Sequence, residues 1–247
     1  MKSTLSIFLM LLAFTATSQT GWQGKFEQMG NMLPTPNQYR TGSGEPGPSY
    51  WQQKADYKIK LELDDENQKI TGSEVVTYYN NSPSALRYLW VQLDQNVRQK
   101  DNLSSLTSGT RGIPDNVTSL RTTQAQSALG DTGFDGGFKL IAVKDTKGND
   151  LDYVVNFTMM KINLPEPLES GDSFSFNIDW WYNINDRGLI GGRSGYEYFK
   201  EDDNYLYIIA QFYPRMAVYD DFNGWQNKQF IGSGEFTLDF GDYDVAI

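Results

Sequence analysis

The side chains of this sequence that could carry chemistry are carboxylates, lysine, tyrosine, serine and threonine, because the sequence contains no cysteine and no histidine. Without cysteine there is neither a disulfide framework nor a thiol nucleophile. Without histidine there is no serine–histidine–aspartate triad and no histidine-based zinc site within these 247 residues. The remaining possibilities are paired carboxylates and sites built from oxygen ligands.

Adjacent carboxylates are the first candidate for catalysis. Asp220 and Asp221 stand side by side, and Glu197, Glu201, Asp202 and Asp203 precede them in the sequence. Glycoside hydrolysis uses two carboxyl groups held about 5–5.5 Å or about 6.5–9.5 Å apart. A linear sequence does not give that separation, and a solvated acidic rim is the simpler interpretation in an acidic protein.

Three other segments have the residue types of a binding site. Asp64–Asn67 and Asp242–Asp244 offer oxygen ligands for calcium but lack the spacing of an EF-hand loop, and a hairpin turn is the alternative interpretation of both. Arg187–Gly195 is rich in glycine, but no helix signal follows it, so we predict a mobile loop rather than a phosphate cradle. Four tryptophans could form a sugar-stacking platform, although strand alternation places about half of such residues in a core: Trp51, Trp180, Trp181 and Trp225.

Charge and the first residues indicate where the protein acts. The net charge of −10 disfavours binding to nucleic acid, which depends on cationic contacts to phosphate. Lys2, the apolar run Leu5–Phe14 and the small residues Ala16 and Ser18 form an export signal, which we place at residues 1–18. The run is too short to be a transmembrane segment, and no other segment is comparable. We therefore expect a secreted or periplasmic bacterial protein.

The elements that must position these residues are strands. Residues 19–55 are rich in glycine, proline and glutamine and read as an extended arm. After the arm, short runs with a period of two or continuous apolar character follow one another, separated by turn signals. The runs that we interpret as strands are Tyr57–Asp64, Ile70–Tyr79 with Gly72 as a possible bulge, Leu86–Leu93, Phe138–Asp145, Leu151–Phe157, Met160–Leu164 ended by Pro165 and Pro167, Ser173–Tyr182, Tyr205–Phe212 as a core strand, and Gly234–Phe240.

This series predicts an all-β domain over residues 56–247, with a large curved, mostly antiparallel sheet or sandwich. Residues 96–137 are rich in small polar residues, so we expect one long surface insertion there, with a short helix near Ser119–Ala128. Tyr243–Ile247 reads as the middle of a strand, and we expect the natural protein to continue beyond it.

Segments in three regions of the sequence (the first strands, a central motif and the last residues) resemble a known family in the same order. Ile208–Asp221 (IIAQFYPRMAVYDD) resembles the T-Q-F-E-P … A-R … P-C-x-D region of the aminopeptidase N family of zinc metallopeptidases. Tyr57–Asn67, Ile70–Gly72 and Leu86–Leu93 resemble the opening of that family's saddle-shaped N-terminal sheet, and Glu235–Ile247 resembles the strand before its catalytic domain. The order and spacing of these motifs carry the resemblance over residues 55–247, and exported relatives of this type occur in Bacteroidetes-like bacteria.

The resemblance implies that catalysis and zinc binding belong to a different domain from this one. In that family the zinc lies in a following helical domain with a Gly-x-Met-Glu-Asn loop and a His-Glu-x-x-His helix, neither of which this sequence contains. This chain is therefore expected to hold no zinc and to be inactive alone. Its expected partners are its own catalytic domain, which it covers, and the peptide substrate, whose cleft it lines near Gln211–Arg215.

Three residues are the substrate-binding candidates that the resemblance implies. Gln211 matches the glutamine of the motif, and the position that contacts the substrate's free amino terminus in the family falls on Tyr213 instead of Glu or Gln. A phenol is neutral near pH 7 but accepts a hydrogen bond. Our hypothesis is that Asp221, or its neighbour Asp220, supplies the negative charge. The alternative is that Tyr213 and Phe212 only close the sheet, since aromatic residues are favoured in strands.

Two other functions remain open at this point. The first is a free-standing, secreted β-sandwich module that binds a carbohydrate or an outer-membrane partner. The second is a hydrolase that uses carboxylates alone. A reading frame that continues past Ile247 to the zinc-binding motifs distinguishes the peptidase domain from both.

Overall fold

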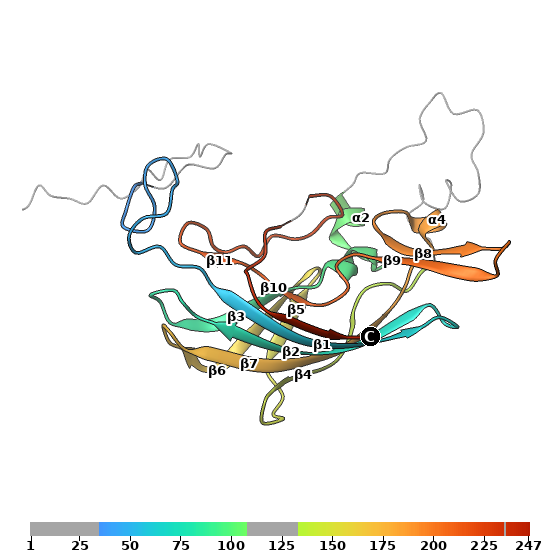
Figure 1. Cartoon of the computed structure of the whole chain (residues 1–247), viewed down its shortest axis with the longest axis horizontal. Coiled ribbons are helices and arrows are strands. Elements are labelled where there is room, and N and C mark those ends of the chain that lie inside the picture. The colour runs from blue at the N-terminus through green and yellow to red at the C-terminus, as the bar shows by residue number, and fades with distance from the viewer. Residues whose placement is uncertain (1–34, 108–132, 235) are drawn as a thin grey trace, which may run out of the picture.

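The computed structural model describes residues 35–107 and 133–247, except residue 235 (Figure 1). The predicted export signal and the predicted helix at Ser119–Ala128 lie outside the described residues, as do the first residues of the arm.

Two β-sheets make up most of the described chain. The five-stranded sheet has the order β13-β1-β2-β7-β4, and the four-stranded sheet has the order β10-β3-β6-β5. Neighbouring strands are antiparallel, except that β13 runs parallel to β1. The strands are β1 (Lys54–Asp64), β2 (Lys69–Tyr79), β3 (Leu86–Gln92), β4 (Lys139–Asp145), β5 (Tyr153–Asn156), β6 (Met159–Leu168), β7 (Ser173–Asn183), β10 (Arg215–Met216) and β13 (Tyr243–Ala246).

Smaller elements connect and flank the sheets. Two further strand pairs are separate from both sheets. Three short helical segments occur among the described residues, and none is long and apolar enough to cross a membrane. These elements are β8 (Ser194–Phe199) with β9 (Asn204–Ile209), β11 (Tyr219–Asp220) with β12 (Gly224–Trp225), the 3₁₀ helix η1 (Asp94–Arg98), and the helices α2 (Leu103–Thr107) and α4 (Arg187–Ile190).

The core lies between the two sheets. Apolar side chains from both sheets form one buried cluster, so the sheets pack as the two layers of a sandwich. The longest strands, β1, β2 and β7, run across Figure 1 as one curved layer. The predicted all-β, mostly antiparallel class is confirmed. The largest fully buried side chains include Tyr78, Phe176, Ile178 and Trp180 from the first sheet and Leu89, Met160 and Ile162 from the second.

Alternation along the sequence located the long strands correctly. In β7 alternation predicts one face with Phe174, Phe176, Ile178 and Trp180, of which all but the half-buried Phe174 are buried. In β1 it predicts one face with Tyr57, Ile59, Leu61 and Leu63; the first two are buried, Leu61 is half-buried and Leu63 is exposed. Leu86–Leu93 was expected at the centre of a sheet because both of its faces are apolar. The strand it forms, β3, lies between β10 and β6.

Gly72 is a close-packing position rather than a bulge, because β2 keeps continuous register with both of its neighbours. A Cβ atom on Gly72 would lie 2.2 Å from Cζ2 of Trp180, which is directly opposite on β7. Only glycine lets the indole lie flat against the backbone of β2.

The two prolines do not end β6, which continues through Pro165 and Pro167 to Leu168. The pairing with β3 shifts between the pairs Leu86–Leu168 and Tyr88–Asn163, so the residues around both prolines lie in an irregular stretch. Proline is tolerated there because no ladder hydrogen bond requires its missing N–H.

The predicted strands in the last third of the chain need correction. Tyr205–Phe212 is not a core strand, because β9 ends at Ile209 and pairs only with β8 in a hairpin whose Leu206 and Ile208 are exposed. Gly234–Phe240 forms only an isolated bridge from Phe240 to Lys54, and the strand begins later, at Tyr243. The segment Arg187–Gly195, predicted as a loop, contains α4 and the start of β8.

Candidate functional site

The segment Ala210–Met216 joins the β8–β9 hairpin to the four-stranded sheet and contains two of the three predicted site residues. At Gln211 the backbone has a φ of 55°, a left-handed conformation that is uncommon for a residue other than glycine. The buried side chain of Gln95 holds this bend, because its Nε2 donates to the carbonyl oxygens of Ala210 at 2.8 Å and Gln211 at 3.2 Å.

A buried ion pair fixes the far end of the segment. Arg215 donates from Nη2 to Oδ2 of Asp94, and the side chains are 12% and 2% exposed. Burial raises the pKa of Asp94, and the charge of Arg215 opposes that shift. The next residue, Met216, donates its backbone N–H to the hydroxyl of Tyr57 at 2.9 Å. The segment is therefore tied to both sheets.

Tyr213 lies in a group of aromatic side chains. Its hydroxyl donates to the hydroxyl of Tyr243 at 3.2 Å, and its ring meets the ring of Tyr57 edge-on, with centroids 5.3 Å apart. Tyr57 and Tyr243 stack at 4.9 Å. Burial raises the pKa of Tyr213, so its phenol is neutral at physiological pH and serves only as a hydrogen-bond donor or acceptor.

Glu74 is a buried carboxyl group that the sequence reasoning missed. It is fully buried in β2, and neither of its oxygens has a hydrogen-bond partner among the described residues. Burial raises its pKa well above the ordinary value. The sequence did carry a signal for this residue, because Glu74 shares the inward-facing parity of Ile70 and Val76.

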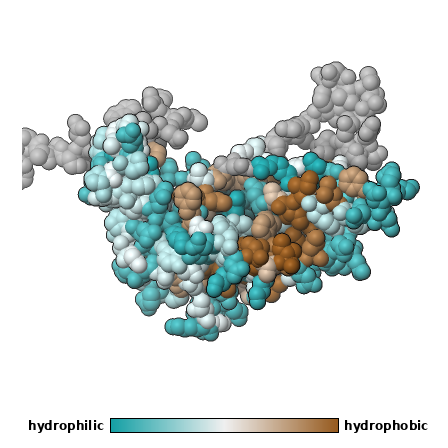
Figure 2. Space-filling model, in the orientation of Figure 1, coloured by the Kyte–Doolittle hydropathy of each residue, from teal (hydrophilic) through white to brown (hydrophobic). Residues whose placement is uncertain are grey.

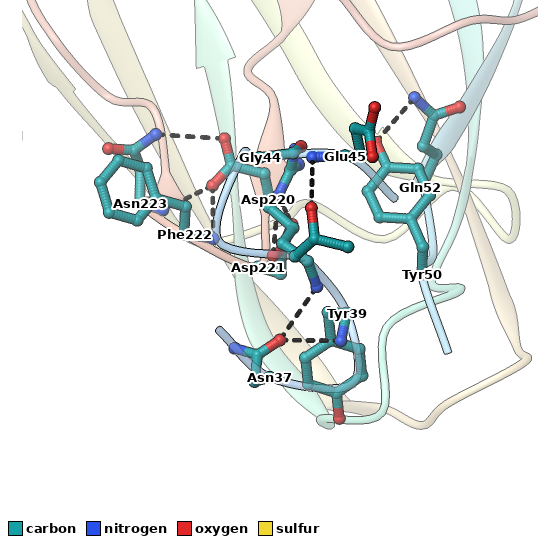
Figure 3. Close-up of polar contacts among 12 residues, drawn as sticks. Asn37, Tyr39, Gly44, Glu45, Tyr50, Gln52, Asp220, Asp221, Phe222 and Asn223 are labelled. Carbon is teal, nitrogen blue, oxygen red and sulfur yellow. Dashed lines mark hydrogen bonds and ion pairs between the residues drawn. The ribbon is translucent and has the colours of Figure 1, made fainter. Parts of the chain in front are cut away.

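Asp221 lies elsewhere, bound to the arm (Figure 3). Nε of Arg40 donates to both of its carboxylate oxygens, at 2.8 and 2.9 Å, and the side chain of Asp221 is only 3% exposed. Among the described residues no recorded contact joins Asp221 to Gln211 or Tyr213. The charge of Asp221 is thus already balanced by a cation of the same chain, and its role towards a substrate stays a prediction.

Asp220 has a structural task in the adjacent turn. Its carboxylate accepts hydrogen bonds from the backbone N–H groups of Phe222 at 3.0 Å and Asn223 at 2.5 Å (Figure 3). It also accepts one from Nε2 of Gln226 at 2.7 Å. Burial, together with the negative charge of Asp220, raises the pKa of Asp239 to about 7. The two adjacent aspartates therefore have separate partners, the turn for Asp220 and Arg40 of the arm for Asp221.

The other chemical candidates have structural partners too. Glu197 pairs with Arg187, and Asp64 accepts a hydrogen bond from the backbone N–H of Asn67 within the predicted turn. No three acidic side chains among residues 35–107 and 133–247 gather closely enough to hold a metal ion. The described residues do not fit a zinc site, so we derive no zinc chemistry for them.

Two of the four tryptophans proposed for a sugar-stacking platform have indole rings that pack against aromatic rings of the same chain. Trp180 is fully buried against Phe138 and Tyr182. Trp225 stacks on Tyr78. A continuous stacking surface of all four side chains is therefore absent from the described part of the chain.

A pocket opens beside Gln211. Its volume is about 420 Å³, and its walls come from four separate parts of the chain. The residues that line it are Val97, Arg98, Ile190, Gly191, Gly192, Arg193, Ser194, Gln211, Phe230, Gly232, Ser233 and Gly234. Of the predicted site residues, only Gln211 belongs to this pocket.

The fold resembles parts of larger solved structures. No family model matches this sequence, and no curated protein matches it. The solved structures to which it is similar include the M1 zinc metallopeptidase of Deinococcus radiodurans, with a TM-score of 0.32 and 10% identity over 74% of this chain and 31% of that chain. A mutant of that enzyme bound to a Tyr-Ser-Ala substrate gives a TM-score of 0.32 and 13% identity over 59% of this chain and 23% of that chain.

A two-domain M1 zinc metallopeptidase mutant bound to L-tryptophan is also similar, with a TM-score of 0.31 and 10% identity over 57% of this chain and 23% of that chain. In each of these comparisons the chain spans less than a third of the length of the structure that it matches. These neighbours are M1 zinc metallopeptidases, and the likeness at this level does not assign their activity to this chain.

Proposed function

We propose that this chain is the N-terminal, non-catalytic β domain of a secreted zinc metallopeptidase of the aminopeptidase type. In this proposal residues 1–18 are an export signal, residues 19–55 an arm, and residues 56–247 the β domain with its insertion at 96–137. The zinc and the catalytic residues belong to a separate domain of the same protein, and the β domain covers it. The parent reaction is the removal of amino-terminal residues from peptides.

One observation carries the proposal: the motifs that resemble the family lie far apart in the sequence but are joined in the fold. The motif strands β1 and β2 are paired, β13 lies beside β1, and β10 lies beside β3. Arg215 and Met216 of the central motif contact Asp94, which directly follows β3, and Tyr57 of β1. Segments that match the family motifs only by chance are not expected to lie on neighbouring strands in this way.

The proposed role of the site is to form one wall of the peptide cleft. The bend at Gln211 is held by Gln95, and the tyrosine group holds Tyr213, so this wall is preorganised. A neutral phenol at Tyr213 accepts one hydrogen bond from a peptide amine but supplies no charge. We propose that the negative charge for the amine comes from Asp221, which must then be released from Arg40.

The gene tests the domain assignment directly. The proposal requires a reading frame that continues beyond Ile247 to a Gly-x-Met-Glu-Asn loop and a His-Glu-x-x-His helix. A stop codon directly after Ile247 would overturn it and would favour a free-standing binding module.

The complete gene product tests the site. Steady-state kinetics of Tyr213→Phe and Asp221→Asn on peptides with free and with acetylated amino termini measure the contribution of each side chain to amine recognition. We expect the preference for the free amine to fall by roughly tenfold in Asp221→Asn, the usual worth of a charge-assisted hydrogen bond. Tyr198→Phe, on the β8–β9 hairpin, is the matched control. An unchanged preference in both site variants would exclude these residues from amine recognition.

A further inference from the structure

The pocket beside Gln211 has an unusual charge for this protein. Among the described residues that line it are two arginines, Arg98 and Arg193, and no aspartate or glutamate, although the chain as a whole has a net charge of −10. Acidic side chains outnumber basic ones by 31 to 21 in the sequence, whereas the charged residues described in this lining are both arginines. A hollow with this lining attracts anions.

Arg98 is the central residue of the pocket. Nη1 donates to Oε1 of Gln95 at 2.9 Å, whereas its Nε is buried and has no hydrogen-bond partner among the described residues. No described carboxylate forms an ion pair with it, in contrast to Arg40, Arg187 and Arg215. Burial lowers its pKa. A largely buried guanidinium without a counter-ion is costly, and an anionic ligand removes that cost.

Two glycine-rich segments leave space next to this cation. Gly191 and Gly192 follow α4, and Gly232 and Gly234 come from the segment after Phe230; all four have φ between 73° and 91°. A Cβ atom on Gly192 would lie 3.5 Å from Nη2 of Arg98, so this residue stands directly beside the guanidinium. The positive φ angles explain why glycine occupies these positions.

The remaining walls are apolar. Val97, Ile190 and Phe230 contribute hydrophobic surface to a volume of about 420 Å³, which is larger than a single small ion needs. An arginine fork matches the planar geometry of a carboxylate, and the walls match an apolar substituent beside it.

We infer that this pocket binds the carboxylate of an organic acid or peptide that carries an apolar group, with Arg98 as the residue that receives the carboxylate. The inference does not depend on the proposed peptidase role, because it concerns a negative group and not a peptide amine. A ligand with a blocked amine therefore tests it separately.

The test is an NMR titration of the ¹⁵N-labelled chain with N-acetyl-L-phenylalanine and, separately, with N-acetyl-L-phenylalaninamide. The two probes have the same apolar group and no free amine, and they differ in the carboxylate alone. We expect the acid to shift the Nε–H signal of Arg98 and the amide signals of Gly191, Gly192 and Gly234. The amide probe should bind at least about tenfold more weakly, the worth of a charge-assisted hydrogen bond.

Variants and a second anion complete the design. Arg98→Gln should reduce affinity for the acid by about tenfold or more, whereas Arg87→Gln, the same change on the exposed face of β3, should leave it unchanged. Equal shifts from acid and amide in the unmodified chain would overturn the inference even if Arg98→Gln fails to fold. Inorganic phosphate that binds as tightly as the acid would also overturn it, since the pocket would then be a general anion site.

Discussion

Glu74 places a carboxyl group where β2 otherwise directs Ile70, Val76 and Tyr78 into the core. Burial without a hydrogen-bond partner favours the neutral form and raises its pKa. Folding therefore requires that this group keep its proton, while the same group ionises in the unfolded chain above its ordinary pKa of about 4.3. The unfolded state binds fewer protons over that range, so the contribution of Glu74 to stability falls as the pH rises.

Replacement of Glu74 by methionine tests this cost. Glu74→Met removes the titrating group and both unpaired oxygens at a similar volume, so we expect a gain of about 1–3 kcal/mol in the free energy of unfolding at pH 8. The gain should be smaller at pH 4, where the carboxyl group is neutral in the folded state and mostly neutral in the unfolded state. Urea unfolding at the two pH values, followed by tryptophan fluorescence, measures the difference.

The control for this prediction is Glu62→Met on the neighbouring strand β1, where the side chain is exposed. A surface change of this kind should alter stability by no more than about 0.5 kcal/mol at either pH. A gain in Glu74→Met that is the same at pH 4 and pH 8 would show that the raised pKa of Glu74 does not limit the stability of the fold.

At the scale of elements, sequence patterns located the strands that have one buried and one exposed face. They failed where the position of a strand depends on which other strand it pairs with. Alternation located β1, β2 and β7 within a few residues, because one face of each strand is buried and the other is not. The apolar run at Tyr205–Phe212 has the same composition as a core strand. Its partner β8, which keeps it away from both sheets, cannot be identified from periodicity.

The arm illustrates the same limit. Its glycines and prolines predict an extended chain, but not that Arg40 reaches across 181 positions to Asp221. Local hydrogen bonds shape the arm around this arginine: Oδ1 of Asn37 accepts from the backbone N–H groups of Tyr39 and Arg40, and the guanidinium lies 5.0 Å from the ring of Tyr50 (Figure 3). The ion pair joins the arm to the turn after β11.

Asp221→Asn should release the arm. The change removes the charge that both hydrogen bonds from Nε of Arg40 require, and the loss of a partly buried pair is expected to cost about 1–2 kcal/mol locally. Local opening controls proteolysis, so we expect trypsin to cleave after Arg40 roughly tenfold faster, as measured by mass spectrometry of the initial fragments.

The matched control is Asp202→Asn, an exposed carboxylate in the turn between β8 and β9. It should leave the rate of cleavage after Arg40 unchanged. Equal rates for Asp221→Asn and the unmodified chain would mean that the arm is held by its other contacts, and that Asp221 is available to a substrate at little cost.

At the scale of the whole molecule, the pocket and the exposed surface depend on several segments at once. The pocket takes its walls from η1, the end of α4, the bend at Gln211 and residues 230–234. The sequence showed the glycines and the arginines of the Arg187–Gly195 segment, but Arg98 lies about 90 positions earlier, and no local rule joins the two. Gln211 was predicted only through its resemblance to a known motif.

Apolar side chains also gather on one side of the molecule. Figure 2 shows them over the region where β9 and the C-terminal strand lie in Figure 1. The exposed apolar residues of the β8–β9 hairpin, of β13 and of the residues on either side of β13 include Tyr198, Phe199, Tyr205, Leu206, Ile208, Leu238, Phe240, Tyr243, Val245 and Ile247. A surface of this kind marks a site of contact with another surface, and under the proposed function that surface belongs to the catalytic domain.

The 247-residue chain by itself should therefore bind a hydrophobic dye such as ANS and self-associate at micromolar concentration. Leu206→Glu together with Ile208→Glu places two charges on the hairpin without disturbing the core, so we expect at least about a twofold loss of dye fluorescence and a shift towards the monomer in light scattering. Ile141→Glu changes a more exposed apolar residue on β4, which forms the edge of the five-stranded sheet opposite β13, and should leave both signals unchanged. A monodisperse chain that does not bind the dye would contradict the need for a covering domain, because the exposed residues would then be compatible with an independent module.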